Sequence, residues 1–418
     1  MTLVCRNGRS DSLVLEGRLR GGECVAVTVT DGVIGAIEPA AATSRVIAPA
    51  FVDPHVHLRS PGREDEETIA SGTAAAAAGG YCAILAMPNT DPVVDSAAVL
   101  GSLVAEAKRE ALVPTGFMAA ISKGLGGGEL TEMAELADAG AAAFTDDGRP
   151  VTSAGLMRRA LQYGAVTGRV LALHCEEPTL SRDGQVHEGP VSAELGLAPY
   201  PSVAESAMVE RDLSLAAYEE RSVHLMHLSA RESVEALRAA QARGVAATGE
   251  VTPHHLVLTD EAVRSLDPNV KMNPPLRSEE DRRALVEALR DGTIACVATD
   301  HAPHAREEKE EPFEDAPFGV TGLETSFAAL YTHLVEPGLV PLETLLERMS
   351  GGPARALGLP EPRIEVGARA NLVLLDLEEE WEVAEGGFRS RSANSWLLGK
   401  TLRGKVLTTV ADGRVVHS

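Results

Sequence analysis

The sequence predicts an α/β fold: a (β/α)8 barrel, similar to a TIM barrel, with a small β-sandwich domain formed from both chain ends. First, short apolar runs alternate with helical stretches over roughly 300 residues, the usual length of such a barrel. Second, both chain ends have the pattern of strands joined by turns. Third, histidines and aspartates collect where the apolar runs end. This last placement favours the barrel over an open, doubly wound sheet.

The two chain ends share one sequence pattern, in which short alternating runs are joined by turns. Near the N-terminus "SLVLEG", "CVAVTVTDG" and "VIGAIEP" alternate apolar and polar residues, and Asp31-Gly32 marks a hairpin turn. The C-terminal "KVLTTVADGRVVHS" repeats this pattern around Asp412-Gly413. Neither end could bury an apolar face alone, so we expect them to combine. The predicted division is 1–47 and 358–418 for the small domain and 48–357 for the barrel.

The barrel strands are expected in the apolar or β-branched runs between these ends. The first run is followed by "EETIASGTAAAAAGG", an alanine-rich helix that ends at Gly79 and Gly80. Similar helical stretches, rich in alanine and glutamate, follow the other runs. The eight runs are 50–57, 81–87, 113–119, 141–145, 169–174, 222–227, 246–251 and 294–300.

Charge and composition limit the kinds of partner. A formal net charge of -23 argues against nucleic acid and against an anionic membrane surface, but not against a small anionic substrate. The five cysteines lie mostly inside apolar runs, as reduced thiols of a cytoplasmic protein do. The first residues lack the layout of a signal peptide, and no apolar stretch is long enough to span a bilayer. These features predict a cytoplasmic protein.

Metal-binding residue types occur at the ends of five runs. In "FVDPHVHLRSPG", His55 and His57 lie two residues apart, so in a strand both point to the same face and can share one metal ion. Alone they could equally be polar residues of a turn. Four histidines and two carboxylates together can hold two divalent ions, and zinc suits nitrogen and oxygen ligands best. The other run ends carry Asp146, Asp147, His174, His227 and Asp300.

The remaining histidines are less informative. Cys175, beside His174, stays a possible ligand. His254 and His255 could support the metal ligands or be merely structural, and we expect them to be structural. His187, His224, His333 and His417 have no neighbouring motif and are expected to have no special role.

The chain resembles a known family in motifs that run in order along its length. "PAFVDPHVHLRSPG", "AMPNTDPV", "FTDDGRP", "LHCEE", "HLSA", "KMNPPLR", "ATDHAPH" and "APFGVTGLET" are similar to the motif series of the class I dihydroorotases, in the amidohydrolase superfamily. The resemblance implies a hydrolase that reversibly opens (S)-dihydroorotate to N-carbamoyl-L-aspartate in the de novo synthesis of pyrimidines (UMP). It also implies a homodimer and an association with aspartate transcarbamoylase.

The resemblance assigns roles to particular residues. It implies one zinc ion on His55, His57 and Asp300 and a second on His174 and His227, with Asp147 and a hydroxide as bridges. Asp300 would also carry the proton between water and the leaving nitrogen. Arg59 and Asn89 would bind the substrate carboxylate, since a guanidinium pairs well with one. The other implied substrate contacts are His57, Asn273, His304 and the backbone of Phe318 and Gly319.

Two other functions remain as alternatives. Hydantoinases and allantoinases resemble this layout but use a carboxylated lysine as the bridge, where this chain offers an aspartate. A non-catalytic scaffold that docks on aspartate transcarbamoylase would not need all six metal ligands. Finally, the acidic run "AREEKEEPFEDA", residues 305–316, is expected to be either a solvated loop or a mobile lid.

Overall fold

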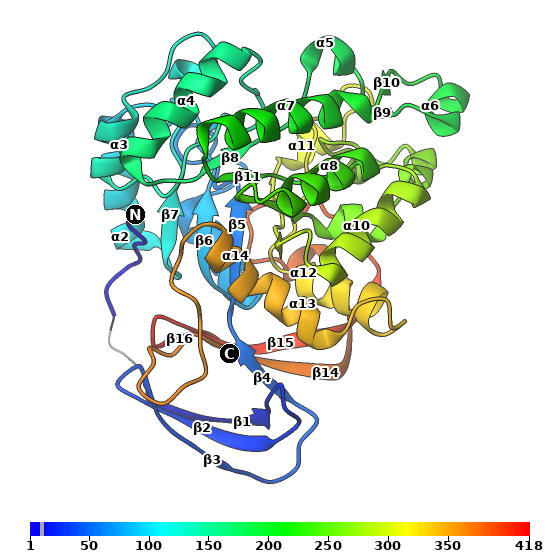
Figure 1. Ribbon diagram of the computed structural model, residues 1–418. Helices are drawn as coiled ribbons and strands as arrows, with labels where there is room; N and C mark the ends of the chain where they lie inside the picture. The colour runs from blue at the N-terminus through cyan, green and yellow to red at the C-terminus, as the bar shows by residue number, and fades with distance from the viewer. Residues whose placement is uncertain (9–11) are drawn as a thin grey trace.

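The barrel strands form two parallel sheets that single bridges join into a ring. The structure, a computed structural model, describes residues 1–8 and 12–418. Bridges at Ala119–Phe144, Phe144–Leu171 and Val56–His301 close the ring (Figure 1). One sheet contains β5 (Phe51–Val56), β6 (Tyr81–Ala86) and β7 (Thr115–Phe117). The other contains β8 (Leu171–Leu173), β11 (Val223–Leu225), β12 (Ala247–Val251) and β13 (Cys296–Val297).

Seven of the eight expected runs contain a barrel strand, and the fourth contributes less. Run 141–145 is bridged through Phe144 to Ala119 on one side and Leu171 on the other. Its backbone also pairs with the β7 side, where the Ala142 and Thr145 N–H groups donate to the Phe117 and Ala119 carbonyls at 2.8 and 2.9 Å. Just beyond it, the Asp146 carboxylate accepts the backbone N–H groups of Ile121 and Ser122 at 2.8 and 2.9 Å. A side chain there satisfies amides that a longer strand would otherwise pair.

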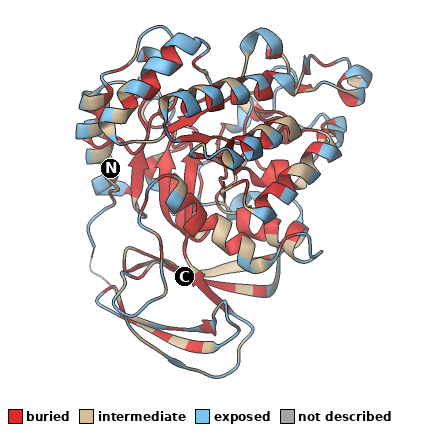
Figure 2. Cartoon of the chain, viewed as in Figure 1, coloured by how far each residue is buried: buried red, intermediate tan, exposed pale blue. Residues whose placement is uncertain are grey.

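The helices surround the ring of strands, with their inner faces buried and their outer faces exposed (Figure 2). The alanine-rich helix begins after the N-cap Thr68, whose hydroxyl accepts the Ser71 N–H, and ends at Gly79. An insertion carries the two-residue strands β9 (Val186–His187) and β10 (Pro199–Tyr200). The helices are α1 (Ile69–Ala78), α2 (Ala97–Glu110), α3 (Met133–Ala139), α4 (Ala154–Thr167), α5 (Pro178–Ser181), α6 (Pro190–Leu195), α7 (Val203–Glu219), α8 (Arg231–Ala242), α9 (Pro253–Val257), α10 (Glu279–Asp291), α11 (Arg306–Lys309), α12 (Ser326–Leu330), α13 (Leu342–Met349) and α14 (Gly351–Ala356).

Both chain ends combine into one β domain, as predicted. Its seven strands form a continuous sheet in the order β16-β15-β14-β4-β1-β2-β3. Asp31 and Gly32 have φ of 50° and 78°, and Asp412 and Gly413 have φ of 46° and 70°, so both expected Asp-Gly turns have the positive φ angles of type I′ hairpins. The strands are β1 (Leu13–Arg18), β2 (Cys24–Thr30), β3 (Val33–Pro39), β4 (Val46–Pro49), β14 (Leu372–Glu382), β15 (Thr401–Ala411) and β16 (Arg414–His417).

Strand β14 ties the small domain to the barrel. Leu372 and Leu374 pack into the core of the small domain, with residues of both of its halves. Val373 and Leu375, on the opposite face of the strand, belong to the barrel core. The N-terminal strands β1–β4 and the C-terminal strands β14 and β15 therefore share one core. The opposite face of β14 packs against the barrel.

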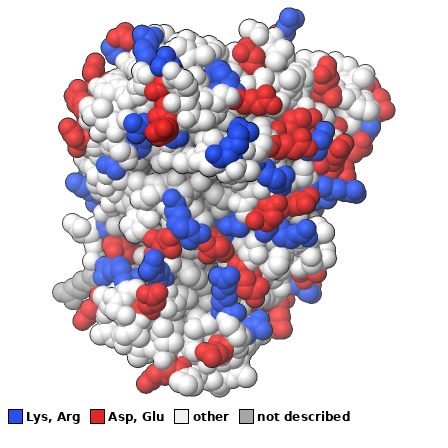
Figure 3. All heavy atoms as spheres, in the orientation of Figure 1, with Lys and Arg blue, Asp and Glu red and all other residues white. Residues whose placement is uncertain are grey.

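The surface carries both signs of charge. Acidic and basic side chains are interspersed on the face that Figure 3 shows, although the chain as a whole has a net charge of -23. No helix in the described part of the chain has both the length and the apolarity that a membrane crossing requires.

Candidate metal centre and substrate pocket

The barrel places the expected ligands together at one end of its strands. His55 lies within β5 and His57 just beyond it, while His174, His227 and Asp300 follow β8, β11 and β13 by one to three residues. His227 and Asp300 have φ of 30° and 47°, values uncommon for residues other than glycine. Such backbone strain gathers at functional sites, where the surrounding fold holds it in place.

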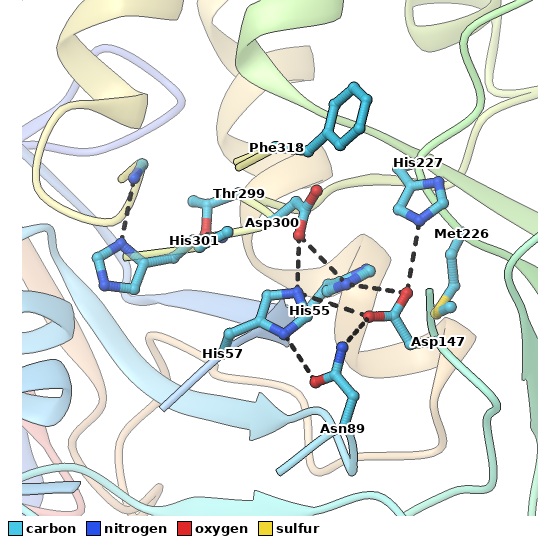
Figure 4. A network of polar contacts seen from close by, with 12 residues as sticks. His55, His57, Asn89, Asp147, Met226, His227, Thr299, Asp300, His301 and Phe318 are labelled. Atoms are coloured by element: carbon cyan, nitrogen blue, oxygen red, sulfur yellow. Dashed lines mark hydrogen bonds and ion pairs between the residues drawn. The ribbon is translucent and has the colours of Figure 1, made fainter. Parts of the chain in front are cut away.

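Asp147 lies at the centre of the cluster (Figure 4). Its Oδ1 is 3.7 Å from His55 Nε2, 3.5 Å from His174 Nδ1 and 3.6 Å from His227 Nε2. Its Oδ2 is 3.6 Å from His57 Nε2. Asp300 Oδ1 lies on the other side of the same histidine pair, 3.4 Å from His55 Nε2 and 3.0 Å from His57 Nε2. One carboxylate thus faces all four imidazoles, as a bridging ligand would.

Three of the four histidines have their outer nitrogen held by a further residue. His55 Nδ1 donates to Glu250 Oε1 at 2.8 Å. His57 Nδ1 donates to Asn89 Oδ1 at 3.0 Å. Likewise His174 Nε2 donates to Glu176 Oε2 at 3.0 Å. Each of these hydrogen bonds favours a proton on the outer nitrogen and turns the inner nitrogen towards the cluster, where it could coordinate a metal ion.

These residues fit a metal ion. His55 Nε2 is buried without a hydrogen-bond partner, although two carboxylates lie 3.4–3.7 Å away. His174 Nδ1 faces His227 Nε2 at 3.0 Å. Buried nitrogens that face carboxylates and one another can be satisfied by a proton or by a metal ion between them. Within this cluster, two groups have their ligand atoms close enough to share an ion: His55 with His57 and Asp300, and His55 with Asp147 and His227.

The pKa shifts indicate the same need for positive charge. Burial alone would lower the pKa of His174, but its bonds to Asp147 and Glu176 overcome burial and raise the pKa to about 9. Burial would raise the pKa of Asp147, yet the His55 charge and hydrogen bonds from neighbouring histidines hold it well below its usual range. The carboxylates therefore stay ionised and attract either protons or metal ions.

A cavity of about 200 Å³ opens beside the cluster. Arg59, with φ of 57°, enters from the loop after β5 and donates from Nε to the Pro303 carbonyl at 3.0 Å. Its Nη2 lies 3.3 Å from His304 Nε2. Phe318 lines the same cavity and is 37% exposed (Figure 4). The cavity is lined by all the residues expected to bind substrate: His57, Arg59, Asn89, Asn273, His304, Phe318 and Gly319.

Both asparagines of the cavity have fixed amide groups. Besides accepting from His57, Asn89 donates from Nδ2 to Asp147 Oδ2 at 3.1 Å. This amide therefore orients two candidate ligands, a role that the sequence did not predict. Asn273 donates from Nδ2 to Glu176 Oε2 at 3.1 Å, and its Oδ1 is buried without a partner. That oxygen is available to accept an N–H group of a ligand.

Backbone groups at Phe318 and Gly319 already have partners. The Phe318 carbonyl lies 2.8 Å from His304 Nε2, and the Gly319 N–H donates to the Lys271 carbonyl at 2.9 Å. Gly319 has φ of 123°, and a Cβ there would come within 2.7 Å of Ala302 Cβ. Only glycine lets the chain pass this close to the cavity wall.

Several candidates lie outside the cluster. Asp146 turns away to bind Ile121 and Ser122, and burial raises its pKa to about 6. The Cys175 thiol faces the Leu173 carbonyl at 3.6 Å and is not among the ligand groups of the cluster. His255 bonds to Thr252 Oγ1 and the Pro274 carbonyl, as a structural histidine does.

Sequence reasoning missed four residues that support the site. Glu250, Glu176 and Glu66 hold site residues through their carboxylates. The expectation that His224 has no neighbour of note was wrong, because its Nε2 donates to Glu250 Oε2 at 2.9 Å. Among these residues only Glu250 had a signal in the sequence. It lies within the strand β12, and a fully buried carboxylate needs partners.

Segment 305–316 is anchored at several points. Lys309 Nζ donates to the carbonyls of Pro268 and Pro317 at 2.8 Å. Lys271 Nζ donates to the Phe313 and Glu314 carbonyls at 2.7 and 2.9 Å, and Phe313 is buried. These contacts hold the segment to the barrel; in this conformation it is not simply a solvated loop.

The whole chain is similar in sequence to known proteins. A family model described as "Dihydro-orotase-like" matches residues 44–233. The chain is 41% identical to a dihydroorotase of Caldanaerobacter subterraneus over 424 residues, which cover 99% of this chain and 97% of that protein. It is 47% identical to a dihydroorotase of Pelotomaculum thermopropionicum, over 90% of this chain and 88% of the other.

Solved structures share the fold. L-hydantoinase (dihydropyrimidinase) of Arthrobacter aurescens superposes with a TM-score of 0.86 at 27% identity, over 100% of this chain and 96% of that one. A D-hydantoinase superposes with a TM-score of 0.82 at 22% identity, over 96% and 94% of the two chains.

Proposed function

The chain belongs to the dihydro-orotase-like family of the amidohydrolase superfamily, and from this premise we propose how its residues carry out the reaction. It is a metal-dependent cyclic amide hydrolase with dihydroorotase activity: it interconverts (S)-dihydroorotate and N-carbamoyl-L-aspartate, a step of pyrimidine synthesis. The observation that carries the proposal is Asp147, whose carboxylate faces the four imidazoles of the cluster.

The proposed metal ligands are His55, His57 and Asp300 for one zinc ion and His174 and His227 for the other, with Asp147 shared. The unpartnered His55 Nε2 and the outer hydrogen bonds on three histidines support this set. When bound, two such ions lower the pKa of a water molecule and polarise an amide carbonyl.

The chain's own groups bind the substrate and move the proton. Arg59 binds the substrate carboxylate, with His304 and Asn89 beside it in the cavity. The free Oδ1 of Asn273 accepts a ring N–H. Asp300, at the cavity wall, takes a proton from the attacking water and returns it to the ring nitrogen as the C–N bond breaks. In the reverse direction the same carboxylate removes that proton as the ring closes.

The hydantoinase alternative is less well supported. The structural neighbours are hydantoinases, but the similar proteins at 41–47% identity are dihydroorotases. The central group of this cluster is an aspartate, and a guanidinium lines the cavity. A substrate with a carboxylate suits that guanidinium better than a neutral cyclic diamide does.

Replacing Arg59 by methionine tests the carboxylate role. We expect kcat/KM for dihydroorotate to fall at least tenfold, because a charged hydrogen-bonded contact is worth roughly 1.5–3 kcal/mol. Turnover of a neutral cyclic diamide should change much less. Equal losses on both substrates would show that Arg59 has only a structural role.

Other features are proposed on the sequence alone. The pattern of strands and helices supports the division into 1–47, 48–357 and 358–418, and the composition supports a cytoplasmic location. The family resemblance supports a homodimer and an association with aspartate transcarbamoylase.

A further inference from the structure

We propose that Glu66 is the positioning residue of the carboxylate-binding site: one oxygen of its side chain holds Arg59 and the other holds His304. This inference rests on the proposed function, in which Arg59 binds the carboxylate of dihydroorotate. Glu66 does not line the cavity itself and would act only through these two side chains.

The contacts are short and buried. Glu66 Oε2 lies 3.0 Å from Arg59 Nε in an ion pair but accepts no hydrogen bond, because the hydrogen of that nitrogen points to the Pro303 carbonyl. His304 Nδ1 donates to Glu66 Oε1 at 3.0 Å. The Glu66 side chain is 0% exposed and that of Arg59 is 12% exposed. With so little water present, the orientation of each group depends on the other.

The Glu66 carboxylate is itself fixed in place. Its backbone N–H donates to the Arg63 carbonyl at 3.0 Å, and its own carbonyl accepts from Ser392 Oγ at 2.7 Å. Arg63 Nη2 lies 2.7 Å from Oε1 and supplies a second positive charge. A carboxylate that is anchored at both its backbone and its side chain can hold two neighbours without moving.

The geometry determines which part of Arg59 remains for a ligand. Glu66 and Pro303 occupy the Nε edge of the guanidinium, which leaves the Nη groups to bind a ligand in the cavity that Arg59 lines. Arg59 Nη2 is 3.3 Å from His304 Nε2, so the two side chains stand next to each other. The substrate would meet a site that is already assembled, which lowers the ordering cost of binding.

Glu66 also carries a negative charge close to the proposed substrate carboxylate. Positioning and repulsion have opposite effects on affinity, so a substitution decides between them. The substrate carboxylate does not change during the reaction, and contacts to it act equally on the ground state and the transition state. Loss of positioning should therefore appear in KM and hardly in kcat.

Glu66→Gln tests the proposal on the metal-loaded enzyme. We expect KM for dihydroorotate to rise at least tenfold, kcat to stay within about threefold, and metal content to stay unchanged. Asp65→Asn is the matched control, since it removes a charge from the adjacent, exposed residue, and its KM should stay at the wild-type value. An unchanged or lower KM in Glu66→Gln would overturn the proposal.

A double substitution shows whether Glu66 acts through Arg59. Glu66→Gln changes log KM by some amount in the wild-type enzyme. In the Arg59→Met background the same substitution should change log KM by less than half of that amount. Fully additive effects would contradict a positioning role. If Glu66→Gln does not fold, Glu66→Asp takes its place, because it keeps the charge but is one methylene shorter, and KM should still rise.

The two levels of the proposal can fail separately. If Arg59→Met leaves KM for dihydroorotate unchanged, then the carboxylate role of Arg59 is wrong. If Arg59→Met raises KM and Glu66→Gln does not, then only the positioning role of Glu66 is wrong.

Discussion

Asp300 is the residue asked to do two things, since it is both a proposed ligand and the proposed proton carrier. Burial would raise its pKa, but the nearby His55 charge and a hydrogen bond from His57 hold the pKa well below the usual range. A carboxylate that remains ionised can accept a proton from water. Its Oδ1 already touches both histidines of the β5 pair.

Asp300→Asn separates these two roles. The amide keeps an oxygen of similar size, so most of the metal should remain on the other ligands. It cannot accept the proton, and general acid-base catalysis is worth roughly 10²–10⁴-fold, so we expect kcat to fall at least a hundredfold. Metal content and steady-state kinetics measure both effects. Near-normal kcat with metal retained would place the base elsewhere, with His304 as the next candidate.

Glu250 should control how tightly the metal binds. Its carboxylate accepts from both His55 and His224, and these bonds overcome burial and lower its pKa to about 2. Glu250→Gln should weaken zinc binding by about 10–100-fold, because the partners of metal-binding histidines have effects of that size. Titration against a competing chelator measures it. Unchanged affinity would mean that Glu250 serves packing alone, and Glu135→Gln, an exposed substitution on α3, is the control.

The sequence predicted the types of ligand but not the groups that orient them. Histidines and aspartates at strand ends are visible in one dimension, because strand ends converge on one face of a barrel. His55 and Glu250 are 195 residues apart, and His304 and Glu66 are 238 residues apart. Only the three-dimensional ring brings each pair together, so no local pattern marks them. The role of Asn89 in holding His57 and Asp147 was hidden for the same reason.

Among the elements, apolar runs predicted strands well where burial alone decides. Strands β5 and β6 are buried along their whole length, and their runs were expected within one or two residues of the observed bounds. Run 141–145 pairs with both neighbouring strands over only a short length, and just beyond it the Asp146 side chain takes the amides of Ile121 and Ser122. Side-chain competition for backbone groups depends on tertiary contacts, which periodicity does not report.

Glu324, just before α12, should make stability depend on pH. Burial outweighs the N–H groups of Arg389 and Ser390 that bond its carboxylate, and its pKa rises to about 7. The folded state then holds a proton that the unfolded state releases above about pH 4.5, so this group lowers stability as the pH rises from about 4.5 to 7.

Glu324→Gln should remove this dependence. The free energy of unfolding of the variant minus that of the wild type should increase by roughly 1–3 kcal/mol when the pH is raised from 5 to 8. Denaturant unfolding of both proteins at the two pH values measures the difference. If this difference in the free energy of unfolding is the same at pH 5 and pH 8, then Glu324 is ionised in the folded protein throughout this range.

For the whole molecule, the two chain ends form a single domain because neither can bury its apolar face alone. The repeated Asp-Gly turns and alternating strands were sufficient to predict this pairing. The detail that one continuous sheet contains all seven strands was not predictable, since it depends on β4 pairing with both β1 and β14. Strand β5 points away from this domain, so the site residues that follow the barrel strands lie at the opposite end of the barrel (Figure 1).

Metal content measured together with turnover tests the proposed mechanism most directly. The purified chain should contain about two equivalents of zinc, lose turnover of dihydroorotate when a chelator removes them, and recover it when zinc is restored. Recovery that reaches its maximum at two equivalents would match a cluster in which Asp147 is shared. Full turnover of dihydroorotate by the metal-free chain would contradict it.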